Sequence, residues 1–273
     1  MTETTQAERP PGVGAAIGVF VLLLVATTVI SVIGYLTAGI NLASLLAEAA
    51  ILVIAMAVMK PFGLKIREVV GKPPDVPGRF WIWALIAALS VGLVANDLTG
   101  YLHQVVPRSA ASTEALVELM VPKSWGDYLL RIACAAIMAG IAEEIAFRGF
   151  LQTVLTRNLG AVRGLILTTF LFAIMHLDPR MIPGVFLIGL ILGYITLLAR
   201  SLWISIIAHA LINALAFTAG MLWPESAQDM ASTLPLPVTA AMLALAIIAV
   251  RSMRQAVCQR ITSDMSSRQQ NEF

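Results

Sequence analysis

Long, unbroken apolar runs constrain the fold of this chain more than any other feature. Eight such runs follow one another, and most are close to the ~20 residues that a helix needs to cross the hydrocarbon core of a bilayer. Backbone polar groups cannot stay unpaired in hydrocarbon, so only helices and closed barrels span a membrane. The runs lack the apolar–polar alternation of a barrel strand. The sequence therefore predicts an all-α fold, a polytopic transmembrane helix bundle of about eight spans.

The composition excludes a water-soluble protein. Apolar residues make up 59% of the 273 residues and charged residues only 12%, with a mean hydropathy of +0.86. A soluble globular domain carries roughly 25% charged residues. The net charge is only +2, and no basic block interleaved with aromatic residues suggests nucleic acid as a partner. Cys134 and Cys258 are too few and too scattered for a disulfide framework or a thiolate metal site.

The apolar pattern divides the chain into one transmembrane domain with short polar ends. Residues 1–12 are expected to form a disordered lead, residues 13–250 the membrane domain with a core at about 126–222, and residues 251–273 a polar cytoplasmic tail. A small interfacial helix is expected at 113–120. The predicted spans are 14–36, 42–59, 80–95, 126–157, 162–177, 183–198, 202–222 and 234–250.

The distribution of basic residues predicts the orientation. With the N-terminus in the cytoplasm, 14 of the 18 Lys and Arg residues lie on the inner side, as the positive-inside rule requires. The four on the outer side are Arg108, Lys123, Arg131 and Arg180. We therefore expect a multi-pass integral membrane protein with both termini cytoplasmic, in the cytoplasmic membrane if the source is bacterial.

The fourth apolar run carries two adjacent carboxylates and an arginine, Glu143, Glu144 and Arg148. Each charge near the centre of a membrane helix costs about 2.5–3.5 kcal/mol on insertion scales, so such groups are functional candidates. Glu144 and Arg148 are four residues apart and meet on one helix face. Glu143 points elsewhere and has no local partner. The spacing thus predicts a structural ion pair and a separate, available carboxylate.

Three further polar residues in later runs are expected to approach Glu143. The turn between the fourth and fifth helices is centred near Leu159, and His176 follows it at nearly the same separation as Glu143 precedes it. At ~1.5 Å per residue both groups lie roughly 24–26 Å from that turn. His209 and Asn213 share a face of the seventh helix because they are four residues apart. All four side chains are expected to line one cavity that opens toward the cytoplasm.

This set of side chains supports water activation. A carboxylate in a low-dielectric site is suited to take and return a proton, while a neutral imidazole helps to deprotonate water. A second histidine and an amide can donate hydrogen bonds to an oxyanion. Two versions stay open at this point. Zn²⁺ or another divalent metal is held by Glu143, His176 and His209, or the glutamate acts without a metal.

Three motifs on three separate helices resemble a known family. They are Glu143-Glu144-x-x-x-Arg148, Phe172-x-x-x-His176 and His209-x-x-x-Asn213. Together they are similar to the signature of the CPBP family, which comprises the type 2 CAAX prenyl proteases and the bacteriocin-processing and self-immunity membrane proteins. The resemblance implies an intramembrane endopeptidase built from eight helices that cleaves near the cytoplasmic side.

The resemblance also implies a role for each motif residue. These are a general base and its helper (Glu143 and His176), oxyanion donors (His209 and Asn213), and supporting groups (Glu144, Arg148 and Phe172), with His209 sharing a metal in the alternative version. The expected partners are the bilayer and a protein or peptide substrate, either membrane-anchored or prenylated. The competing hypothesis is a non-enzymatic membrane transporter or bacteriocin-immunity protein that uses the same buried polar cluster.

Two polar residues outside the motifs carry weaker expectations. Glu48 lies in the second span without an assigned partner, and a hydrogen bond in helix packing is the favoured interpretation. His103 is expected in the outer loop, in contact with solvent.

Overall fold

The computed structural model describes residues 11–106, 108–225 and 233–270, and every regular element in these ranges is a helix. The α-helices are α1 (Val13–Ala38), α2 (Ile40–Met59), α3 (Ile66–Val70), α4 (Gly78–Val105), α5 (Ala110–Met120), α6 (Trp125–Arg131), α7 (Met138–Glu143), α8 (Thr153–Leu159), α9 (Ala161–Ile174), α10 (Ile182–Ala199), α11 (Trp203–Leu222) and α13 (Leu236–Gln270). A 3₁₀-helix, η1 (Lys60–Phe62), and two π-helices, η2 (Ile132–Ile137) and η3 (Glu144–Gln152), complete the described elements.

Six helices in the described ranges are long and apolar enough to cross a membrane, which confirms the integral membrane class. They are Val13–Ala38, Ile40–Phe62, Gly78–Val105, Ile182–Ala199, Trp203–Leu222 and Leu236–Arg260. The apolar helix α9 is shorter, and the helical run from Trp125 to Leu159 is divided by η2 and η3. The count of eight spans and the orientation of the termini stay predictions.

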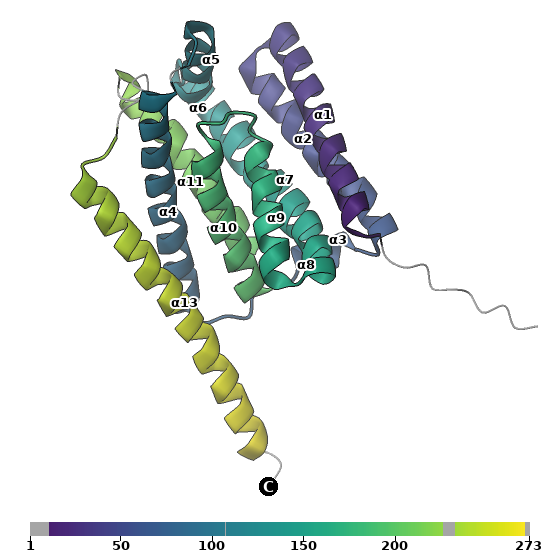
Figure 1. The fold of residues 1–273 in the computed structure, drawn as a ribbon. Coiled ribbons are helices and arrows are strands. Elements are labelled where there is room, and N and C mark those ends of the chain that lie inside the picture. The colour runs from purple at the N-terminus through teal and green to yellow at the C-terminus, as the bar shows by residue number, and fades with distance from the viewer. Residues whose placement is uncertain (1–10, 107, 226–232, 271–273) are drawn as a thin grey trace, which may run out of the picture.

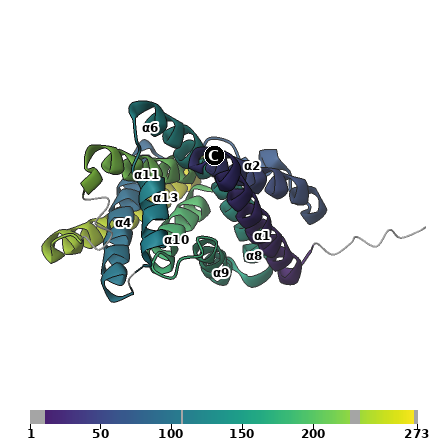
Figure 2. The same cartoon turned by 90° about the horizontal axis from the view of Figure 1, so that it is seen from above.

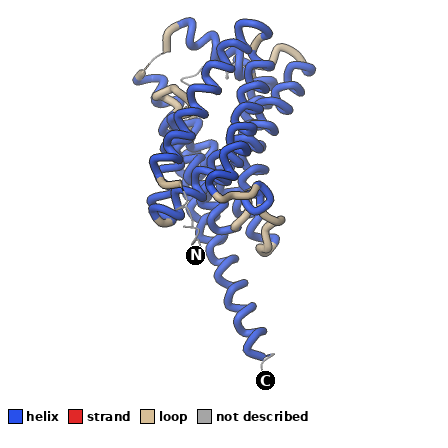
Figure 3. Tube along the Cα trace, turned by 90° about the vertical axis from the view of Figure 1, so that its right-hand side faces the viewer, coloured by secondary structure: helices blue, strands red, loops and turns tan. Residues whose placement is uncertain are grey.

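The helices form a central group flanked by two helix pairs. The hairpin of α1 and α2 lies on one side, the crossed pair of α4 and α13 on the other, and α9, α10 and α11 lie between them (Figure 2). α1 begins and α13 ends at the same end of the bundle (Figure 1). From the side, α13 extends well beyond the other helices (Figure 3).

A tight turn places the fourth apolar run antiparallel to α9. Gly160 has φ +83°, a left-handed backbone that only glycine adopts without strain, and it ends α8 and precedes α9. The two helices then pack so closely that a Cβ on Gly164 would lie 2.5 Å from the amide nitrogen of Thr156. The turn expected near Leu159 is confirmed.

The third span was predicted too short. It was expected to end at Ala95, but α4 continues to Val105 and includes Asp97 and His103, both buried. The Asp97 carboxylate accepts hydrogen bonds from the amide of Leu234 (2.6 Å) and the hydroxyl of Thr239 (2.7 Å). These long-range partners satisfy a charge that interrupts the apolar run. The expectation that His103 is solvated was wrong.

Other boundaries also differ from expectation. The fifth helix ends at Ile174 rather than Leu177, so His176 lies just beyond it. The interfacial helix expected at 113–120 is present as the longer α5. The segment expected as a polar tail after Val250 continues α13 to Gln270. Residues 1–10 of the expected disordered lead and residues 271–273 of the expected tail lie outside the described residues.

Candidate functional site

The centre of the molecule is the π-helix η3, which presents three polar side chains to its neighbours. Glu144, Arg148 and Gln152 are four residues apart and are 0%, 2% and 2% exposed. π-helical segments inside longer helices are rare and often occur at functional sites. All nine residues of η3 are buried, so this stretch forms the polar centre of the bundle rather than a surface.

Glu144 and Arg148 form the ion pair that their spacing predicts. Arg148 Nη1 donates to Glu144 Oε1 at 2.8 Å, and Arg148 Nη2 donates to the carbonyl oxygen of Gly189 at 3.2 Å. The guanidinium carbon also lies 4.3 Å from the ring centroid of Phe172, a cation–π contact. A buried charge pair needs such additional partners, because desolvation cancels much of the attraction between the two charges.

His209 joins both glutamates. Its Nδ1 lies 2.9 Å from Glu144 Oε1, and its Nε2 lies 3.7 Å from Glu143 Oε2. Because a carboxylate paired with Arg148 only accepts, Nδ1 of His209 carries a proton, and the neutral form of this imidazole has its lone pair on Nε2. The 3.7 Å separation is too long for a direct hydrogen bond. Glu143 is 14% exposed along its side chain and Glu144 is fully buried, so the two adjacent acids have different surroundings.

The ring of Phe172 separates the two histidines and contacts both. Its centroid lies 5.3 Å from that of His176 and 5.9 Å from that of His209, in edge-to-face arrangements. His176 Nδ1 lies 3.1 Å from the carbonyl oxygen of Phe172, which can only accept, so Nε2 of neutral His176 is also unprotonated. The next residue, Leu177, has φ +55°, a strained conformation that fixes the chain direction just after this histidine.

Asn213 comes from the face of α11 that also carries His209. Its Nδ2 donates to the carbonyl oxygen of Ala135 in η2, at 3.3 Å. This hydrogen bond uses one N–H of the amide and ties α11 to the first π-helix, while the second N–H is available to another acceptor. The structure thus brings Glu143, Glu144, Arg148, Phe172 and His209 together, with His176 against Phe172 and Asn213 against η2.

Sequence reasoning missed one polar group beside these residues, Gln152, and assigned no partner to another, Glu48. Gln152 lies four residues after Arg148, as Arg148 lies four residues after Glu144. The Nε2 of Gln152 donates to the carbonyl oxygen of Gly193 at 3.1 Å. The four-residue spacing of these side chains and of the two glycines could have revealed this contact. Glu48 on α2 has a buried Oε2 without a hydrogen-bond partner in the described part of the chain, so the expected hydrogen bond is not present at this oxygen.

The residues suggested as metal ligands, Glu143, His176 and His209, are of types that bind zinc, but they are not arranged as a metal site. Imidazoles whose Nδ1 donates to an oxygen and whose Nε2 is free are common zinc ligands. Within the ranges that the structure describes, however, no group of three or more His, Cys, Asp or Glu side chains comes together as a metal site. We therefore derive no catalytic step through a metal.

Fold and site together define an integral membrane protein of helices with a buried carboxylate–imidazole centre. Residues 125–215 match the family model described as type II CAAX prenyl endopeptidase Rce1-like. This match covers a third of the chain and supports the resemblance to the CPBP/CAAX protease family over these residues. The comparison with curated proteins and the comparison with solved structures gave no match.

Proposed function

We propose that this protein is an intramembrane endopeptidase in which Glu143 activates a water molecule to hydrolyse a peptide bond. The observation that carries the proposal is the 3.7 Å separation of Glu143 Oε2 and His209 Nε2, which are both acceptors when His209 is neutral. Two lone pairs at this distance repel each other unless a donor lies beside both. A water molecule supplies two O–H groups and suits this position.

The hydrolysis follows from the protonation states of these groups. Glu143 takes a proton from the water as its oxygen attacks the peptide carbonyl carbon, which forms a tetrahedral oxyanion. The protonated Glu143 then gives that proton to the amide nitrogen as the C–N bond breaks. The products are a carboxylic acid and an amine, which exchange one proton to become a carboxylate and an ammonium group, and the glutamate is regenerated. Glu144 stays ionised beside Arg148 throughout, and its hydrogen bond orients His209.

The remaining motif residues have supporting roles in this scheme. The free N–H of Asn213 is the candidate donor to the oxyanion, because both neutral histidines have their lone pairs at Nε2. His176 then acts as an acceptor that helps to orient water, and Phe172 holds the two imidazoles apart. His209 contributes a donor to the oxyanion only once it is protonated. The sequence-based expectation gave the oxyanion role to both His209 and Asn213. In this scheme Asn213 has that role alone unless His209 is protonated.

The family match suggests the class of substrate. The matched model describes prenyl endopeptidases, so a prenylated or otherwise membrane-anchored protein or peptide is the proposed substrate. The bilayer is the second proposed partner, since a membrane-anchored substrate would reach the site from the membrane. We propose that the site opens to the cytoplasmic side and, for a bacterial source, that the protein resides in the cytoplasmic membrane.

The test is cleavage of prenylated and unprenylated peptide libraries by the full chain in lipid nanodiscs. Glu143→Gln should lower turnover by about 10²–10⁴-fold, since it removes the proton acceptor and keeps the side-chain shape. The matched control is Glu114→Gln, an exposed glutamate on α5, which should cleave like the wild type. Full-strength cleavage by Glu143→Gln, or no cleavage by a folded wild type, would exclude the proposed mechanism.

Cleavage in the presence of a strong chelator tests whether the reaction needs a metal. The glutamate mechanism predicts cleavage that persists in the presence of a strong chelator and no stoichiometric metal by elemental analysis. Loss of cleavage on chelation, restored by Zn²⁺, would instead make Glu143, His176 and His209 the proposed ligands.

A further inference from the structure

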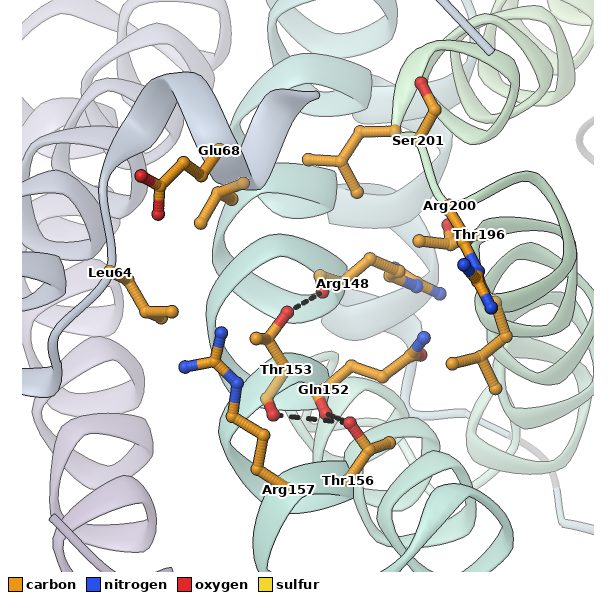
Figure 4. Close-up of a pocket in the computed structure, with 13 residues that line it drawn as sticks. Leu64, Glu68, Arg148, Gln152, Thr153, Thr156, Arg157, Thr196, Arg200 and Ser201 are labelled. Atoms are coloured by element: carbon orange, nitrogen blue, oxygen red, sulfur yellow. Dashed lines mark hydrogen bonds between the residues drawn. The ribbon is translucent and has the colours of Figure 1, made fainter. Parts of the chain in front are cut away.

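A second polar site lies beyond the ion pair, toward the end of the bundle where α1 begins and α13 ends. It is a cavity of about 320 Å³ between η3 and α8 on one side, the end of α10 on the other, and the connection through α3. Figure 4 shows Arg157 and Arg200 on opposite sides of this pocket, with Arg148 and Gln152 between them. The volume is at the lower end of the range for ligand pockets, roughly 300–1,000 Å³.

The lining of the pocket is positively charged. Arg157 and Arg200 are exposed, and neither forms an ion pair within the described part of the chain. The single acidic side chain in the lining, Glu68, is 63% exposed and pairs with Lys65 at 3.1 Å. Arg148 is neutralised by Glu144. Two guanidinium groups therefore remain without a counter-ion, and a guanidinium matches the oxygens of a phosphate or carboxylate.

One local feature supports a polar ligand in the pocket, and another sets the backbone at Arg200. Gln152 is 2% exposed, and its Oε1 is buried without a hydrogen-bond partner although its Nε2 bonds to Gly193. An unpaired buried acceptor is unusual, so this oxygen is a candidate to accept a hydrogen bond from a molecule in the pocket. Arg200 has φ +50°, a left-handed conformation that costs about 1–2 kcal/mol for such a residue, at the end of α10.

We propose that this pocket binds a phosphate-bearing headgroup that also carries hydroxyl groups. Arg157 and Arg200 bind the phosphate oxygens, and a hydroxyl of the ligand donates to Gln152 Oε1. The position of the pocket favours a lipid source, since it lies at one end of the bundle among helix termini. Basic pockets between transmembrane helices at the cytoplasmic side are typical binding sites for anionic headgroups. A soluble polyol phosphate presents the same chemistry from another source.

The experiment measures binding and stability, so its outcome is separate from that of the proposed protease activity. The full chain is placed in nanodiscs of phosphatidylcholine with or without phosphatidylglycerol, and its melting temperature is recorded. Glycerol 3-phosphate is titrated into the phosphatidylcholine nanodiscs as the soluble probe. Arg157→Gln and Arg200→Asn remove one charge each, and asparagine tolerates the left-handed backbone at residue 200. Arg163→Gln on α9 is the matched control, because Arg163 is exposed and lies outside the pocket.

Phosphatidylglycerol should raise the melting temperature of the wild type and of Arg163→Gln by about 2–4 °C, and the rise should disappear in both pocket variants. A rise with glycerol 3-phosphate alone, lost in the same two variants, would support the site with a soluble ligand. The proposal is overturned if neither probe stabilises the wild type, or if Arg163→Gln loses the effect as fully as the pocket variants. Two independent pocket variants keep the test valid if one fails to fold.

Discussion

Glu144 and His209, on two different helices, meet through a 2.9 Å contact between Oε1 and Nδ1. The same oxygen accepts from Arg148 at 2.8 Å, so one carboxylate oxygen fixes both a cation and an imidazole. The other nitrogen of His209 then necessarily faces Glu143. Glu144 is therefore the proposed positioning residue, and Glu143 is the proposed general base.

Replacing Glu144 should destabilise the protein far more than replacing Glu143. Glu144→Gln leaves the Arg148 guanidinium buried without a counter-ion, and breaking a buried pair in this way costs about 3–5 kcal/mol. Glu143→Gln leaves no partner behind and should cost less than about 1 kcal/mol. Thermal unfolding in detergent, followed by tryptophan fluorescence, measures both. Equal stability of the two variants would show that the Glu144–Arg148 pair is not structural.

Gly193 should not tolerate a side chain. A Cβ at this position would lie 2.5 Å from Gln152 Oε1 and 2.5 Å from Leu165 Cδ1. Gly193→Ala is expected to cost about 1–3 kcal/mol, as overpacked substitutions do. Gly18→Ala on α1 is the control, because a Cβ there meets nothing within 4 Å, and it should be neutral or slightly stabilising. Adding Gln152→Ala to Gly193→Ala should recover part of the loss, and no recovery would rule out Gln152 as the obstacle.

The sequence allowed the main pairing in the site to be predicted because it depends on local spacing. Glu144 and Arg148 face the same side in any helix-like geometry. The free-energy cost of placing a charge in a membrane helix identifies both as unusual in an apolar run. Helix rise alone predicted that Glu143 and His176 lie at similar distances from the turn near Leu159. The actual contacts of the histidines could not be predicted, because the edge-to-face packing on Phe172 depends on how three helices meet.

The π-helical geometry of η3 and the true length of α4 had no local signal. A π-helix shifts each backbone hydrogen bond by one residue, and tertiary packing rather than composition decides where this occurs. The third span was predicted to end where Asn96 and Asp97 interrupt the apolar run. It continues because partners more than 130 residues away satisfy the Asp97 carboxylate. A hydropathy profile contains no information about such partners.

Asn213 provides a kinetic test of the oxyanion role. Asn213→Leu keeps a side chain of similar size and removes both amide N–H groups. If one of them stabilises the oxyanion, the variant should lose about 10²–10³-fold in kcat with little change in KM, since the interaction forms only in the transition state. The measurement is steady-state kinetics with a peptide identified from the library. A higher KM with unchanged kcat would instead assign Asn213 to substrate binding.

Asp178 should make stability sensitive to acid. It lies in the connection between α9 and α10, is 8% exposed, and pairs with Arg108 and Arg180. Burial acts to raise the pKa of the Asp178 carboxyl, but hydrogen bonds from Arg180 and the nearby charges of Arg108 and Arg180 outweigh it, and the pKa lies below its usual value. A pKa lowered by folding contributes stability that is fully present above the unfolded value of about 3.9.

That contribution should disappear as the pH falls from about 4 through the folded-state pKa of Asp178. Below that pKa the carboxyl is protonated in both the folded and the unfolded chain. Asp178→Asn lacks the carboxylate at every pH. Its deficit in melting temperature relative to the wild type should be largest near pH 7 and shrink steadily below pH 4. Asp75→Asn is the control, since Asp75 is 88% exposed along its side chain. A deficit for Asp178→Asn that stays constant from pH 7 to pH 3 would show that the charge of Asp178 does not stabilise the fold.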